Sequence, residues 1–315
     1  MLTNASKDEA VRKTLLESLP VSLPPEAETW ALLYDESEEG LAQRALAFYP
    51  HKIRNGRWWR YQNGIYKEVK DQAMLPDALQ IIRIAAALQP DSTAIQEMIG
   101  KVNTARNILK AWQGLASQQE DEEEWDKNLW YLNFTDCTID LEAYCKGTPY
   151  ILEHSPEYRI TESTGYSWKE VENYDPKALD EVVKNIEIYL PNKDIRKYFQ
   201  RAVGRSLTAA AAAEDKCIWM LGPDGGNGKS TLLNAIKGAL GSYFYEMQGK
   251  YLYYSNRDRD AEAPSPELSG MKNKRIVNFC EYNGIRTLDS EKYKNYNEEE
   301  EEKKPIAEQG GLGLE

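Results

Sequence analysis

The stretch CIWMLGPDGGNGKSTLLNAIKGALG, residues 217–241, decides the fold class of this chain. It opens with an apolar run, residues 217–221, that is typical of a short buried strand. A glycine-rich loop follows, and apolar residues then recur at helical spacing up to Leu240. Strand, loop and helix in this order predict an α/β protein with a phosphate-binding loop.

The residue types of this loop suit a nucleotide phosphate. Glycines let consecutive backbone N–H groups turn toward an anion, and the helix behind them presents its positive dipole end. Lys229 is placed to reach the β- and γ-phosphate oxygens, and Ser230 to ligate Mg²⁺. Gly222 and Gly228 enclose five residues where the usual pattern has four, so either the loop is one residue longer or Gly222 is not its anchor. The alternative is a glycine-rich turn before an ordinary helix.

A second candidate site residue follows the apolar run RIVNFC, residues 275–280. This run predicts a buried strand that ends at Glu281 and lies beside the strand of the phosphate loop. A carboxylate at that strand end can hold Mg²⁺ or polarise the attacking water. The alternative for Glu281 is an ordinary acid at a strand end.

Length and composition set broad limits. A chain of 315 residues predicts about two domains, and its amino-acid composition is typical of globular proteins. The net charge of −12 is concentrated in residues 120–126 and 298–302, while residues 193–294 carry a net charge of +5, which permits a DNA partner. No apolar run is long enough for a membrane span and no signal peptide is present, so a cytoplasmic protein without a membrane partner is expected. Four cysteines and two histidines form no metal or disulfide pattern.

The N-terminal half predicts mixed helices and strands. Helical periodicity marks residues 38–49, 76–88 and 104–115, and later 179–190 and 195–207. Two Asn-Gly pairs between aromatic runs, Asn55-Gly56 and Asn63-Gly64, predict a β-hairpin or meander. Residues 129–153 form a second strand-rich block, and a domain boundary is placed at Asp175-Pro176.

One segment in this half allows two interpretations. Cationic and aromatic side chains alternate from residue 54 to residue 61, as in surfaces that bind nucleic acid. In a strand, alternate side chains face one side, so Trp58 and Trp59 point to opposite faces and at least one of them must be buried. Core packing is therefore favoured over DNA contact.

Together these segments resemble superfamily 3 helicases of the phage and plasmid primase-helicase type. The loop PDGGNGKST is close to that family's phosphate loop, and LSGMKNKRIV before Glu281 is similar to its approach to the acidic strand. LDSEKYK, residues 288–294, resembles the stretch just beyond. Residues 38–71, with LNF, IDL and HSPEYRIT further on, resemble the helicase-associated N-terminal domain. The resemblance covers about residues 31–294.

The resemblance implies an α+β helicase-associated domain at 31–175, after a 1–30 extension, then a small helical layer and a partial P-loop, AAA+-like ATPase core at 176–294. It implies an ATP-dependent DNA helicase of a phage or mobile-element replication system, a hydrolase acting on single-stranded or forked DNA as a homo-oligomeric ring. ATP and Mg²⁺ are the implied cofactors, with catalytic roles for Lys229 and Glu281 and metal contacts from Ser230 and Glu281. The residues expected to hold the nucleotide are Gly225, Gly226, Asn227, Gly228, Lys229, Ser230 and Thr231.

The chain also departs from that family. The strand ending in a γ-phosphate-sensing Asn and the arginine finger are not found, so we expect a C-terminal truncation. The charged tail at 295–315 is expected to be a disordered end or a foreign reading frame, and an interaction tail is less favoured. The primase catalytic domain is not found either, because residues 1–30 are too short to hold it. A non-catalytic nucleotide-binding replication accessory or helicase remnant is the alternative function. A small-molecule P-loop kinase is a weaker one, because the upstream domain carries no substrate motif.

Overall fold

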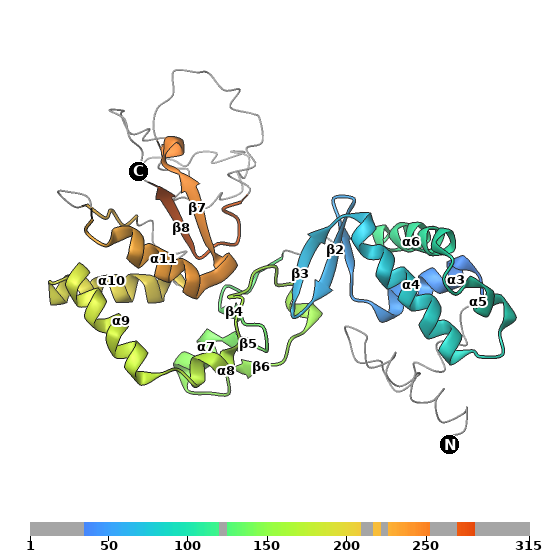
Figure 1. Cartoon of the computed structure of the whole chain (residues 1–315), viewed down its shortest axis with the longest axis horizontal. Helices are drawn as coiled ribbons and strands as arrows, with labels where there is room; N and C mark the ends of the chain where they lie inside the picture. The colour runs from blue at the N-terminus through green and yellow to red at the C-terminus, as the bar shows by residue number, and fades with distance from the viewer. Residues whose placement is uncertain (1–34, 120–124, 209–216, 222–225, 253–269, 281–315) are drawn as a thin grey trace, which may run out of the picture. The chain divides into compact units, whose positions relative to one another are not determined.

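The computed structural model shows a mixed α and β fold and describes residues 35–119, 125–208, 217–221, 226–252 and 270–280 (Figure 1). The described residues fall into two units, considered separately below. The N-terminal unit holds those up to Lys127 with residues 135–138 and 152–162, and the C-terminal unit holds the others. This division precedes the boundary expected at Asp175-Pro176, and the functional domain assignment remains a prediction.

The N-terminal unit combines helices with an antiparallel sheet. Its elements are α3 (Glu38–Phe48), β1 (Lys52–Arg54), β2 (Arg57–Gln62), β3 (Ile65–Val69), α4 (Asp71–Leu88), α5 (Thr93–Met98), α6 (Val102–Ser117) and the 3₁₀ turn η1 (Pro156–Tyr158). The three predicted helices are thus confirmed. Helix α4 begins five residues earlier than expected, with Pro76 inside it. Proline removes one backbone hydrogen bond there, and the fully buried Met74 anchors the preceding turn in the core.

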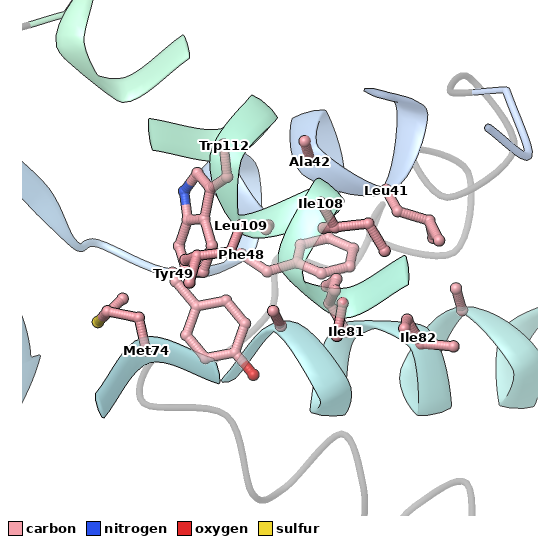
Figure 2. Close-up of a cluster of buried hydrophobic side chains, with 14 of the residues drawn as sticks. Leu41, Ala42, Phe48, Tyr49, Met74, Ile81, Ile82, Ile108, Leu109 and Trp112 are labelled. Atoms are coloured by element: carbon pink, nitrogen blue, oxygen red, sulfur yellow. The ribbon is translucent and has the colours of Figure 1, made fainter. Parts of the chain in front are cut away.

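Helices α3, α4 and α6 enclose the core of this unit (Figure 2). Apolar side chains at i, i+3 and i+4 line the inner faces, as the periodicity predicts. Phe48, Ile81, Ile108 and Trp112 are at most 1% exposed. Burying each such side chain contributes about 1.5–3 kcal/mol, so this cluster is the main stabilising feature of the unit.

Both Asn-Gly pairs form the predicted turns. Strand β2 pairs antiparallel with β1 and β3, and Asn55, Gly56, Asn63 and Gly64 all have φ between +52° and +76°. Two consecutive residues in the left-handed region define the hairpin turn whose twist matches the strands. A Cβ at Gly64 would lie 2.4 Å from the His154 ring, whereas one at Gly56 would meet nothing within 4 Å.

The C-terminal unit contains two small sheets and the helices before and after the glycine-rich segment. Its elements are β4 (Tyr131–Asn133), β5 (Thr138–Asp140), α7 (Leu141–Lys146), β6 (Ile151–Leu152), α8 (Trp168–Glu172), α9 (Pro176–Tyr189), α10 (Lys193–Ser206), α11 (Lys229–Leu240), η3 (Gly241–Tyr243), β7 (Phe244–Gln248), η4 (Gly249–Leu252) and β8 (Ile276–Cys280). The first residue of β5, Thr138, belongs to the N-terminal unit, because it is the last residue of the segment 135–138.

Residues 141–146 lie within the expected strand-rich block but form helix α7. Asp140 Oδ1 accepts hydrogen bonds from the N–H groups of Glu142 and Ala143, and Gly147 ends the helix with φ +69°. These two caps are worth about 1 kcal/mol each in favourable cases and outweigh strand propensity. In the part of the chain that the structure describes, no helix has the length and apolar character needed to cross a bilayer.

Candidate functional site: a phosphate-binding helix start

Helix α11 begins at Lys229, directly after the glycine-rich loop, as the sequence predicts. Gly228 is its N-cap, with φ +74°, and no side chain caps the first N–H groups. Gly226 also has positive φ, +81°, and a Cβ there would meet nothing within 4 Å. An uncapped start after two left-handed glycines leaves backbone donors and the positive dipole end for an anion.

The charged and hydroxyl groups at this helix start also suit a phosphate. Lys229 is half-buried, Ser230 and Thr231 are exposed, and the first turn of α11 carries no acid. Within the described residues, Lys229 forms no ion pair. These residues therefore fit the triphosphate of a nucleotide.

An aromatic ring packs against Gly228, the N-cap of α11. A Cβ on Gly228 would lie 2.2 Å from Cδ1 and 2.6 Å from Cε1 of Tyr189, the last residue of α9. The ring therefore packs directly against the Gly228 backbone, which only glycine permits. This contact ties the helical layer before the loop to the residue that precedes Lys229.

The far end of α11 is held by the segment 163–166. Tyr166 Oη donates a hydrogen bond to the Ala239 carbonyl at 2.7 Å, and Ser242 N–H donates to the Ser163 carbonyl at 3.0 Å. A Cβ on Gly241 would lie 2.2 Å from the Thr164 carbonyl oxygen. Both ends of the helix are therefore positioned by residues from before the loop.

Residues 217–221 do not form the expected strand. They have no strand pairing, and Leu221 is 87% exposed. The expectation that β8 lies beside this run is also wrong within the described residues, where β8 pairs in parallel with β7 instead. Strand β7 was not predicted from the sequence, and its burial does not alternate, because Phe244 and Met247, three positions apart, are its two buried residues.

Two predicted site residues cannot be placed. Gly225 and Glu281 lie outside the described residues, whereas Gly226, Asn227, Gly228, Lys229, Ser230 and Thr231 are brought together at the start of α11. Among the described residues there is no group of three or more His, Cys, Asp or Glu side chains able to hold a metal ion. The assignment of Glu281 remains a prediction.

The arginines of the aromatic segment in the N-terminal unit have structural partners. Arg57 pairs with Glu68 at 2.6 Å, Arg60 pairs with Asp77 at 2.7 Å, and the Arg54 guanidinium lies 5.6 Å from the centre of the Trp125 ring. Trp58 is fully buried in the core. Packing is therefore the role that these contacts support, in agreement with the sequence-based preference.

A buried polar cluster that the sequence did not indicate adjoins this segment. His51 Nδ1 accepts a hydrogen bond from Tyr61 N–H at 3.1 Å, so the proton of the neutral ring is on Nε2, 3.4 Å from Asp77 Oδ2. Burial lowers the pKa of His51, against the opposing effect of Asp77. Burial also raises the pKa of Tyr49, whose ring lies 5.1 Å from the His51 ring.

Comparison with known proteins places this chain in the class of helicase-related proteins. It is 25% identical over 257 residues to a protein of Acanthamoeba polyphaga mimivirus that is provisionally named helicase L207/L206. The match covers 73% of this chain and 25% of the viral protein, so the chain spans about a quarter of that relative's length.

The chain belongs to the D5 N terminal like family, which matches residues 41–205. The resemblance to phage-type primase-helicases is thereby confirmed. The matched range ends before the glycine-rich loop, so the case for nucleotide binding rests on the geometry of α11.

Proposed function

We propose that this chain is part of an ATP-dependent DNA helicase of a phage or mobile-element replication system. The observation that carries the proposal is the uncapped start of α11, where two glycines with positive φ precede Lys229. This arrangement binds phosphate in unrelated nucleotide-binding proteins because it offers backbone donors, a dipole and a cation together. Membership of a helicase-related family supports DNA as the macromolecular substrate.

Each residue of the site has a distinct proposed role. The N–H groups of residues 226–231 and the Lys229 ammonium bind the β- and γ-phosphates. Ser230 and Glu281 would hold Mg²⁺, which would neutralise charge on those phosphates. Water attacks the γ-phosphorus, the bond to the bridging oxygen breaks, and ADP and phosphate leave, with Glu281 orienting the water and its proton.

The experiment compares Lys229→Ala with Lys237→Ala by equilibrium titration with a fluorescent ATP analogue and Mg²⁺. Both lysines are on α11, but Lys237 lies in the last turn, where it pairs with Glu246. Losing a charge-assisted contact of about 1.5–3 kcal/mol predicts a 10- to 150-fold weaker affinity for Lys229→Ala and little change for the control. Equal affinities in two folded variants would refute the assignment of the phosphate loop.

A nucleotide-binding accessory without turnover is the alternative, since it would share the same loop. Steady-state hydrolysis measured across a titration of single-stranded DNA separates the two. Turnover that rises with DNA supports the helicase, and tight binding without turnover supports the accessory. Assembly into a homo-oligomeric ring remains part of the helicase proposal and is tested by the mass of the complex in solution.

A further inference from the structure

Helix α10 carries a row of cations on one face. Its fourteen residues, KDIRKYFQRAVGRS, include five basic side chains and one acid, Asp194, in a chain whose net charge is −12. Lys193, Lys197 and Arg201 are spaced four residues apart, so they lie on one face about 6 Å from each other along the axis. We call these three residues the basic row.

The basic row is exposed, and no described residue forms an ion pair with it. Each of the three side chains is exposed, and none forms an ion pair or a side-chain hydrogen bond among the described residues. Arg196 on the same helix differs, because it pairs with Glu187 at 3.1 Å and donates hydrogen bonds to the Leu190 and Pro191 carbonyls. Arg196 therefore holds the turn between α9 and α10, while the basic row has no such partner among the residues that the structure describes.

We propose that the basic row binds the phosphate backbone of a nucleic acid strand. A row of cations that rises about 12 Å along the helix complements a linear polyanion with regularly spaced charges. Tyr198, 59% exposed on the same helix between Lys197 and Arg201 in sequence, offers a ring on which a base can stack. The choice of DNA as the strand rests on the proposed function.

A lipid surface fits the helix less well. An amphipathic helix that lies on a membrane inserts its apolar face between the headgroups. On α10, Phe199, Ala202 and Val203 are half-buried within the protein, so this part of the apolar face is already partly covered. Ile195 on this helix stays 54% exposed, but the three cations of the basic row are exposed as well and suit phosphate contacts without insertion.

The test measures the affinity of the full chain for a fluorescent single-stranded oligonucleotide, without nucleotide, as salt rises from 50 to 200 mM. Each phosphate contact contributes about −0.7 to the slope of log affinity against log salt concentration, so three contacts predict that the wild-type affinity falls about twentyfold over this range. The double variant Lys197→Gln/Arg201→Gln keeps one contact, so its affinity should fall only about threefold over the same range. The control, Lys177→Gln with Lys184→Gln on α9, removes the same charge from exposed positions and should follow the wild type.

The outcomes distinguish this inference from the proposed function. Equal salt dependence in the two double variants, or no binding by the wild type at 50 mM salt, would overturn the basic row as a DNA contact. Row-dependent binding to phosphatidylserine vesicles without DNA binding would also overturn it. Affinity for the fluorescent ATP analogue should be unchanged in both variants, so a failed nucleotide site would be seen separately in Lys229→Ala.

Discussion

Replacing Gly228 with alanine should disturb the start of α11 more than the same change at Gly226. Both glycines have positive φ, so alanine costs about 1–2 kcal/mol at either position. At Gly228 the new Cβ would also lie 2.2 Å from Tyr189 Cδ1, against an ordinary contact of at least 3.4 Å. The ring would have to retreat by about 1.2 Å. Overpacking of this kind adds about 1–3 kcal/mol.

Hydrogen exchange at the first turn of α11 measures this difference. The Leu232 N–H donates to the Gly228 carbonyl at 2.9 Å, so its exchange reports local opening at the junction. Relative to Gly226→Ala, the opening equilibrium in Gly228→Ala should rise by a further 5- to 150-fold. Adding Tyr189→Ala removes the clashing ring and should restore at least about 1 kcal/mol of the free energy of local opening that Gly228→Ala removes.

A double-mutant cycle decides whether Tyr189 is the cause. If the effects of Gly228→Ala and Tyr189→Ala add within about 0.5 kcal/mol, the two residues are not in energetic contact. Equal exchange in Gly226→Ala and Gly228→Ala would also contradict the packing described here. Neither result depends on nucleotide binding.

Two further predictions concern the N-terminal unit, and both are read from tryptophan fluorescence during urea unfolding. Gly64→Ala should destabilise by about 1–3 kcal/mol more than Gly56→Ala, because both have positive φ but only Gly64 faces the His154 ring; matching midpoints would exclude that contact. The lowered pKa of His51 lies below the unfolded value of about 6.5, so protonation favours unfolding and stability should fall as the pH drops below about 6.5. His51→Asn, which can still accept the Tyr61 N–H, should lose that pH dependence, and an unchanged profile would assign the titration to another group.

Local chemistry explains why much of the fold is predictable. Helices α3, α6, α9, α10 and α11 follow from apolar spacing near 3.6 residues, and the β1–β3 meander follows from two Asn-Gly turns. At the site, the glycines with positive φ and the helix that begins at Lys229 come from contiguous residues. Features that depend on contiguous residues can be predicted without the tertiary structure.

The remaining features depend on contacts between distant residues. Tyr189 is 39 positions before Gly228, and nothing in its local sequence indicates that its ring packs on the loop. The His51–Asp77 pair likewise joins the residue before β1 to the middle of α4. Residues 217–221 show the opposite case, in which apolar composition predicts a strand but the structure does not form one there.

The path of the chain between its two units determines how the protein can be dissected. It passes from one unit to the other five times between Lys127 and Ser163. The Tyr66 N–H donates to the Ile160 carbonyl at 2.8 Å, and Asp126 accepts two hydrogen bonds from Thr161. A fragment cut at Lys127 would therefore leave the sheet of the N-terminal unit without these partners. Expression of that unit alone should extend to at least Glu162, and protease sites within 128–162 should be protected in the intact chain.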